Sequence, residues 1–290
     1  MSESIFLFDG EQPQVRDASS GEWCIAMAIQ PTEQARGPWD PLALHGGAPA
    51  ALITSAFERM EPGSELRIAR LGFEFLRPIP LAPLTLSTRI VRPGRRVQEL
   101  AAELITADGG DGPSRHVICR ASALRVQALP AEVPAAAAQD AAGAPDTRAL
   151  APPEAGSPAR FTLDGSSDSS FAATAMEMRW LDDPLVLGPA RVWMRLRHPL
   201  LPGEPLTSLT RLAATADFGN GIGAALPFDR FLFINADLTI HLRRQPRGEW
   251  IGLDARTLLQ CGGTGLAESV LHDTHGPVGR AFQTLVVQPR

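Results

Sequence analysis

Alternating apolar and polar residues recur along the chain and predict β-strands. In residues 234–244, INADLTIHLRR, one side of the predicted strand carries Ile234, Ala236, Leu238, Ile240 and Leu242. A strand with this alternation buries one face and exposes the other. Most of the polar row between these residues is therefore expected to face water, and any functional role has to be argued for single positions such as Asn235.

The same order of elements is predicted twice. One helix is bounded by Pro49 and Gly63 and the other by Pro205 and Gly219, and both pairs are 14 residues apart. Proline is favoured at the start of a helix and glycine just past its end. Strand-like runs follow each helix, at 70–78, 84–92, 96–109 and 115–126 in the first half and at 231–244, 248–260, 265–276 and 279–288 in the second. This order predicts an α+β fold with two antiparallel sheets, each wrapped around one central helix.

A stretch rich in alanine and proline separates the two halves. Residues 130–160 nearly lack large apolar side chains and cannot build a core. We therefore predict an N-terminal module at 1–129, a linker at 130–160 and a C-terminal module at 161–290.

Composition narrows the class of protein. The chain of 290 residues is 44% hydrophobic and 20% charged, as in globular proteins, and its net charge of -5 argues against a nucleic-acid surface. No apolar run of about 18 residues is present to span a membrane, and the N-terminus lacks the features of a secretory signal. A cytoplasmic location is the expectation.

Two absent residue types limit the chemistry. All 27 basic residues are arginine, which excludes Schiff-base chemistry on lysine, and the chain has no tyrosine. Cys24, Cys119 and Cys261 are far apart and without metal-ligand spacing, so they are interpreted as reduced, mostly buried thiols. We predict neither a metal ion nor a cofactor.

A few polar residues depart from the local pattern. Asp217 lies in the last turn of the second helix, where the helix dipole disfavours a carboxylate, and Gln283 shares a strand face with apolar residues. Gly46 and Gly47 follow His45 just before the first helix, where free backbone N–H groups can bind a carbonyl oxygen. Alternatively, Asp217 points to water and His45 begins a tight turn. GNGIG at 219–223 is interpreted as a flexible connection rather than a phosphate loop.

Several landmarks together resemble the acyl-CoA thioesterase II family, the TesB-like double hot-dog proteins. They are HGG before the first helix, FEFLRPIP, RVWMRLR, ATAD at the end of the second helix, NADLTIHLRRQP and GRAFQTL near the C-terminus. The resemblance covers most of both halves and implies a double hot-dog fold. It also implies hydrolysis of an acyl-CoA by a water that an Asp, a Thr or Ser, and a Gln hold.

The resemblance assigns catalytic roles to Asp217, Asn235 and Gln283, and Asn235 replaces the family's hydroxyl residue. We expect Asp217 to accept a proton from a water that the two amides orient, and the segment His45–Gly46–Gly47 to bind the substrate. A non-catalytic acyl or acyl-CoA binding protein is the main alternative, because of the asparagine. A hot-dog dehydratase is disfavoured because those enzymes carry an Asp and His pair on one segment and no such segment lies near either helix, and a purely structural repeat protein is least favoured. Open sheet edges favour a homo-oligomer.

Overall fold

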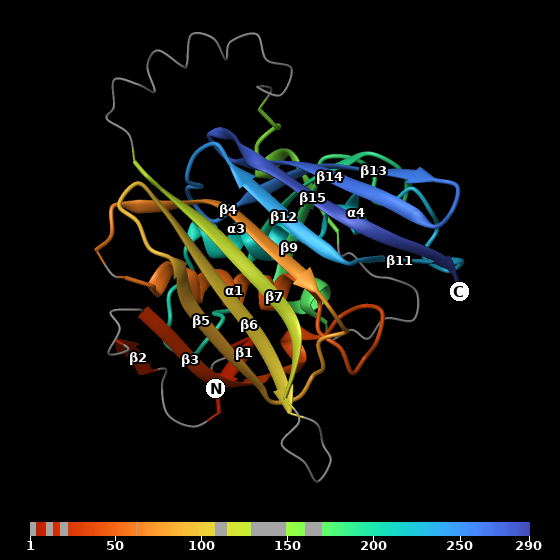
Figure 1. Cartoon of the computed structure of the whole chain (residues 1–290). Helices are drawn as coiled ribbons and strands as arrows, with labels where there is room; N and C mark the ends of the chain where they lie inside the picture. The colour runs from red at the N-terminus through yellow and green to blue at the C-terminus, as the bar shows by residue number, and fades with distance from the viewer. Residues whose placement is uncertain are drawn as a thin grey trace.

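The structure is a computed structural model that describes residues 4–9, 14–17, 23–61, 63–107, 115–128, 149–159 and 170–290. In Figure 1 the strands pass across the two longer helices, and the colours of the two halves meet near the middle of the sheet. No helix in these described ranges is both long and apolar enough to span a membrane.

Antiparallel strands make up most of the described chain. The first half contains β1 (Phe6–Phe8), β2 (Gln14–Asp17), β3 (Trp23–Pro31), β4 (Leu66–Phe75), β5 (Leu84–Arg92), β6 (Val97–Ala107) and β7 (Arg115–Gln127). The second half contains β8 (Ser157–Pro158), β9 (Met176–Trp180), β10 (Ala190–Leu196), β11 (Phe231–Asn235), β12 (Asp237–Leu242), β13 (Ile251–Gln260), β14 (Thr264–Asp273) and β15 (Gly276–Pro289). Every predicted strand run therefore contains a strand, with ends displaced by a few residues.

The prediction of two antiparallel sheets left open whether they join, and the described strands of both halves form one continuous 15-stranded sheet. Its path runs β1-β3-β5-β6-β7-β4-β12-β15-β14-β13-β10-β9-β8, with β2 on β3 and β11 on β15. The two halves join where β4 pairs with β12, with Leu238 opposite Phe73 and Ile240 opposite Leu71. All four of these side chains are buried, so the apolar rows of β4 and β12 stabilise the junction by packing beside each other.

Both predicted helices are present. Helix α1 (Gly47–Arg59) has Pro49 in its first turn and ends before Gly63, whose φ of 85° suits glycine. Helix α3 (Ser208–Ala216) begins after Thr207, whose hydroxyl accepts a hydrogen bond from the Thr210 amide at 3.0 Å. The threonine cap, rather than Pro205, therefore sets the start of α3.

The two helices pack against each other and against the sheet. Leu52, Ile53 and Phe57 of α1 and Leu212 of α3 are fully buried. Removing one large apolar side chain from water contributes roughly 1.5–3 kcal/mol. The short elements are the 3-10 helices at Glu33–Ala35 and Pro153–Ala155, the π-helix at Phe171–Ala175 and α4 (Gly219–Ile222).

The predicted strand at 231–244 is interrupted at Ala236. Asn235 lies opposite Leu285 of β15 and Thr239 lies opposite Phe282, so four steps along one strand match three along the other. The extra residue is a β-bulge, which reverses the facing of the side chains before it. Ile234 is accordingly 43% exposed while Phe233 is buried. The expected facing was wrong for this end of the strand, and Asn235 lies on the apolar side.

Part of the predicted linker falls within the described residues. Residues 149–159 contain β8, which pairs with β9, and the Trp193 side chain donates a hydrogen bond to the carbonyl oxygen of Ala151 at 2.7 Å. Residues 129–148 and 160–169 lie outside the described part of the chain. The boundaries at 1–129, 130–160 and 161–290 remain a prediction.

A buried carboxylate stabilises the turn between β14 and β15. Asp273 accepts hydrogen bonds from both terminal nitrogens of Arg244, at 2.5 and 2.6 Å, and from the backbone amides of His275 and Arg247. Burial by itself raises the pKa of the Asp273 carboxyl, but these hydrogen bonds and the Arg244 charge outweigh it and lower the pKa. The ionised form therefore stabilises the fold.

We expect Asp273→Asn to lower the free energy of unfolding by about 2–3 kcal/mol at pH 7, because it breaks a buried, charge-assisted network. A carboxyl with a lowered pKa stabilises the fold fully above its unfolded pKa of about 3.9 and loses this effect as the pH falls through the folded value. Urea unfolding of both proteins at several pH values should therefore show the difference shrinking in acid. Asp182→Asn is the control, since Asp182 also pairs with an arginine but its side chain is 32% exposed. An equal loss in both variants would contradict this prediction.

Candidate active site

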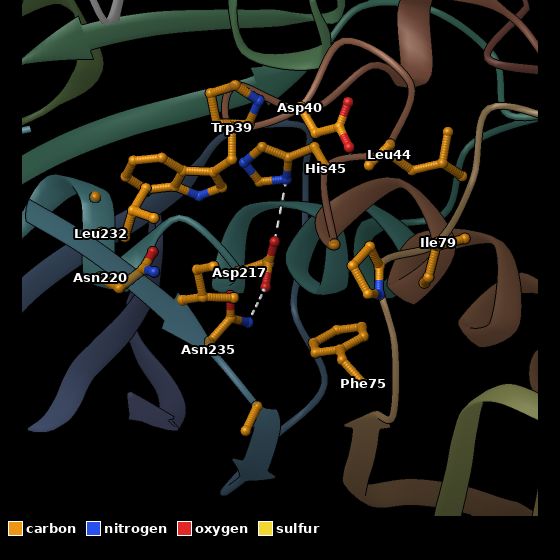
Figure 2. A pocket seen from close by; sticks show the side chains of 18 of the residues that line it. Trp39, Asp40, Leu44, His45, Phe75, Ile79, Asp217, Asn220, Leu232 and Asn235 are labelled. Atoms are coloured by element: carbon orange, nitrogen blue, oxygen red, sulfur yellow. Dashed lines mark hydrogen bonds and ion pairs between the residues drawn. The ribbon is translucent and has the colours of Figure 1, made fainter. Parts of the chain in front are cut away.

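A cavity of about 540 Å³ opens between segments of the two halves of the chain. Its apolar wall includes Trp39, Leu44, Phe75, Ile79 and Leu232, and its polar lining includes Asp40, Asp217, Asn220 and Asn235. Figure 2 shows the Asp217 carboxylate between His45 and Asn235, with a dashed contact to each. His45 and Asn235, which lie on either side of this carboxylate, are 190 positions apart in the sequence.

Asp217 is the C-cap of α3, as its predicted place in the last turn requires, and its side chain is only 3% exposed. The C-terminal end of α3 is an unfavourable place for a carboxylate, but the N-terminal end of α1 lies against the same group. A helix N-terminus stabilises negative charge. The conflict seen in the sequence is therefore offset by a second helix.

Three side chains contact the Asp217 carboxylate. Asn235 Nδ2 donates to Oδ1 at 2.7 Å, His45 Nδ1 lies 3.0 Å from Oδ2, and Gln283 Nε2 lies 3.4 Å from Oδ1. The β-bulge at Ala236 turns Asn235 toward this group. Each carboxylate oxygen therefore has a side-chain nitrogen close to it.

Gln283 lies behind Asp217 and is not among the residues that line the cavity. It is 2% exposed, donates through Nε2 to the Asp217 carbonyl oxygen at 3.0 Å and accepts the Asn220 amide at 2.9 Å through Oε1. It shares its buried face with Ala281 and Leu285, as the sequence predicted. Its contacts hold the corner between α3 and α4.

The segment GNGIG is not a flexible connection. Residues Gly219–Ile222 form the short helix α4, and Gly219, Asn220 and Ile222 are buried. A Cβ added at Gly219 would lie 2.6 Å from the Ser269 hydroxyl and 2.9 Å from Gln283 Oε1. Gly219 is therefore required by close packing, which the sequence pattern alone does not distinguish from mobility.

His45 is held between two phenylalanine rings. Its ring centroid lies 4.2 Å from that of Phe218 and 5.2 Å from that of Phe171, and its side chain is 11% exposed. The Gly47 backbone amide donates a hydrogen bond to His45 Nδ1 at 3.0 Å. Sequence analysis grouped His45 with substrate binding, whereas its nearest charged neighbour is Asp217.

Gly46 and Gly47 allow two close approaches. A Cβ added at Gly46 would lie 2.8 Å from Asp217 Oδ2, and one added at Gly47 would lie 2.5 Å from the Ala214 carbonyl oxygen of α3. Gly46 lines the cavity and Gly47 does not. Glycine is needed at both positions because the carboxylate and α3 occupy the space of a side chain.

Sequence reasoning missed the aromatic side of the site. Trp39 contacts Phe228 and Phe233 with ring centroids 5.7 and 5.5 Å apart, and Phe218 follows Asp217 directly. No periodic pattern marks Trp39 or Phe228, because both lie in loops. Phe218 could have been noted as an apolar residue next to the candidate carboxylate.

The cysteines are not suited to nucleophilic chemistry at this site. Burial, together with the charges of Glu74 and Asp217, raises the pKa of the Cys119 thiol to about 12. Cys261 is exposed, which corrects the expectation of mostly buried thiols, and nothing is described for the Cys24 side chain. Within the described ranges, no three His, Cys, Asp or Glu side chains are arranged to hold a metal ion.

We expect iodoacetamide at pH 8 to modify Cys261 in the native protein and to leave Cys119 unmodified, because only a thiolate reacts. Peptide mass spectrometry after a timed reaction measures both sites. The same reaction in urea is the control, since unfolding exposes Cys119. Rapid modification of Cys119 in the native protein would show that the thiol is more accessible and more acidic than its surroundings indicate.

Models of known families match both halves of the chain. The acyl-CoA thioesterase N-terminal domain matches residues 35–126, and the acyl-CoA thioesterase C-terminal domain matches residues 144–287. Together the two matches span well over half of the sequence. No curated protein matches the chain.

Solved structures agree on the fold. A conserved protein of unknown function with a hot-dog fold from Alicyclobacillus acidocaldarius is 16% identical, with a TM-score of 0.67 over 91% of this chain and 93% of that one. The acyl-CoA thioesterase II TesB2 from Mycobacterium marinum is also 16% identical, with a TM-score of 0.62 over 96% of each chain. At this identity the likeness establishes the hot-dog fold and nothing finer.

Proposed function

Because this chain belongs to the acyl-CoA thioesterase family and is a thioester hydrolase, we propose that it hydrolyses an acyl-CoA to a free acid and CoA. In this proposal Asp217 is the general base. One observation carries the proposal: a buried carboxylate, held by Asn235 at 2.7 Å, forms part of the wall of a largely apolar cavity. A cavity with a few converging polar groups is the usual form of a small-molecule site.

The proposed reaction begins with a water on Asp217 Oδ2. Oδ1 already accepts from Asn235 and lies near Gln283, and we assign the water to Oδ2, whose side-chain neighbour is His45 Nδ1 at 3.0 Å. Asp217 takes one proton from the water as its oxygen attacks the thioester carbon. The tetrahedral intermediate then breaks its C–S bond, and the proton on Asp217 passes to the departing CoA sulfur, so that acid and thiol are formed.

The N-terminus of α1 is proposed to stabilise the intermediate. Gly46 lines the cavity, and its amide hydrogen has no acceptor among the described residues. A free N–H at the positive end of a helix can donate to the oxygen that becomes negative when water attacks. The thioester carbonyl would thus point toward Gly46, with the reacting carbon near Asp217.

Asn235 can replace the hydroxyl residue of the related enzymes. Its Nδ2 gives Asp217 the hydrogen bond that a hydroxyl would give, and its Oδ1 remains as an acceptor for the water. Gln283 acts from behind the carboxylate, through its bonds to Asp217 and Asn220, and holds both chain segments.

The cavity walls suit an acyl chain at one side and CoA at the other. Trp39, Phe228 and Phe233 form an aromatic cluster that favours an apolar group. The exposed Arg77 also lines the cavity. Arginine binds phosphate oxygens well, which supports contact with the CoA phosphates.

The test is release of free thiol from a panel of acyl-CoAs that differ in chain length, branching and aromatic content. We expect turnover for at least one member above the blank without enzyme. Absence of turnover throughout the panel, together with tight binding of an acyl-CoA by calorimetry, would instead support a binding protein of the same fold.

A further inference from the structure

We propose that Asn220 is a specificity-determining residue, whose Oδ1 accepts a hydrogen bond from an N–H or O–H group of the bound thioester. This inference rests on the proposed function, because it adds a contact with the substrate of the same cavity. Asn220 lines that cavity and is 8% exposed. Figure 2 shows its amide among the side chains of the cavity wall, below the Trp39 indole in this view.

The orientation of the Asn220 amide follows from its neighbour. Nδ2 donates a hydrogen bond to the backbone carbonyl oxygen of Phe233 at 3.3 Å. The opposite orientation would set Oδ1 against that oxygen, and two acceptors repel each other. Oδ1 is therefore directed away from the Phe233 carbonyl. It accepts no hydrogen bond from the residues that the structure describes, and it is not one of the fully enclosed polar atoms, so it keeps surface in the cavity.

The backbone around Asn220 is held firmly. Its amide N–H donates to Gln283 Oε1 at 2.9 Å, and Gln283 Nε2 donates to the Asp217 carbonyl oxygen at 3.0 Å. The preceding residue also packs closely, because a Cβ added at Gly219 would lie 2.6 Å from the Ser269 hydroxyl. An acceptor fixed in this way can bind a donor without first being ordered, which favours selective binding.

The proposed reaction leaves Oδ1 of Asn220 without a role. Asp217 takes the proton, Asn235 contacts the carboxylate and the water, and the Gly46 N–H is assigned to the thioester oxygen. A bound substrate displaces water from the cavity, whose apolar wall includes Trp39. A polar atom that loses water without gaining a partner weakens binding. A substrate with a hydrogen-bond donor at this position is therefore favoured over one that places only carbon there.

An acyl-CoA has two possible sources of this donor. The carrier has an amide N–H near its sulfur, and some acyl groups carry a hydroxyl. Both are neutral donors that an amide oxygen accepts in the same way. Substrates that lack one donor at a time therefore distinguish the two sources.

Two pairs of substrates test the proposal. The first pair is the butyryl thioester of N-acetylcysteamine and that of 2-mercaptoethyl acetate, in which an ester oxygen replaces the amide N–H. The second pair is 3-hydroxybutyryl-CoA and butyryl-CoA. We expect the unaltered protein to show about 5- to 100-fold higher kcat/KM for the donor-bearing member of at least one pair, and Asn220→Leu to bring this ratio to within about threefold of unity. The pair that responds identifies the donor as the carrier amide or the acyl hydroxyl.

The pairs also separate recognition from damage to the fold. Asn220→Leu removes the hydrogen bond to the Phe233 carbonyl, so thermal unfolding must show that the variant is folded, and Asn220→Ala takes its place if it is not. An equal loss of kcat/KM for all four substrates would assign Asn220 a structural role and overturn the proposal. A lack of preference in both pairs for the unaltered protein would overturn it without any variant.

The outcome for Asn220 is distinguishable from the outcome for the proposed function. If no thioester is turned over, the proposed function fails. The four thioesters then stay intact, and calorimetry gives their Kd values for the unaltered protein and for Asn220→Leu, whose ratios decide whether Oδ1 binds the donor. Turnover of acyl-CoA without a preference in either pair would reject the role of Asn220 alone and leave the proposed function standing.

Discussion

Asp217→Asn is expected to lower kcat for acyl-CoA hydrolysis about 10²- to 10⁴-fold and to leave KM nearly unchanged. The amide has the shape of the carboxylate but cannot take a proton from water, and a positioned general base contributes about this much. The side chain is only 3% exposed, so no bulk water can take over as base from the same position. Free-thiol release at saturating acyl-CoA measures kcat, and its dependence on substrate concentration gives KM.

Asp229→Asn is the matched control, because it removes a carboxylate that lies on the exposed surface. It should retain activity within about threefold, as surface substitutions usually do. Thermal unfolding must show that Asp217→Asn is folded. Unchanged turnover in folded Asp217→Asn would transfer the role of base to another group.

Gly46→Ala is expected to lower kcat about 10²-fold through one added methyl group. The φ of -59° and ψ of -25° at Gly46 are helical, so the backbone conformation at this position accommodates alanine without strain. The new Cβ would instead lie 2.8 Å from Asp217 Oδ2 and 3.0 Å from Oδ1, which forces the carboxylate to move. A displacement of about 1 Å at a reacting group can cost this much in rate. The measurement is the same thiol-release assay.

Gly72→Ala provides the comparison for that variant. It adds the same methyl group in β4, where the nearest atom would be the Ser122 hydroxyl at 3.3 Å. Its kcat should stay within about threefold of the unaltered protein. Full activity of Gly46→Ala would mean that the carboxylate does not need its present position, and the proposed mechanism would fail with it.

Local signals predicted much of the fold. Pro49 lies in the first turn of α1 and Gly63 follows its end, and the sequence pattern located the strand runs after each helix, because helix ends and half-buried strands depend on nearby residues. The junction of β4 with β12 could not be predicted in this way. Which strand edges meet depends on contacts between residues such as Leu71 and Ile240, which are far apart in the sequence.

The candidate site was predicted in part. Asp217 and Gln283 departed visibly from apolar surroundings, and the structure brings both together with Asn235. The facing of Asn235 was wrong because one extra residue at Ala236 reverses the alternation, and only pairing with β15 reveals it. The glycine at position 46 was interpreted as a source of free N–H groups, while its contact with Asp217 depends on the docking of two helices.

The junction between β4 and β12 also makes this protein a natural candidate for splitting into two polypeptides. Each fragment made alone would present one bare central strand edge, and such edges associate readily. The first fragment would carry His45 and Gly46 and the second Asp217 and Asn235, so neither would hold a whole site. Recovery of thioesterase turnover on mixing would therefore report reassembly of the sheet itself.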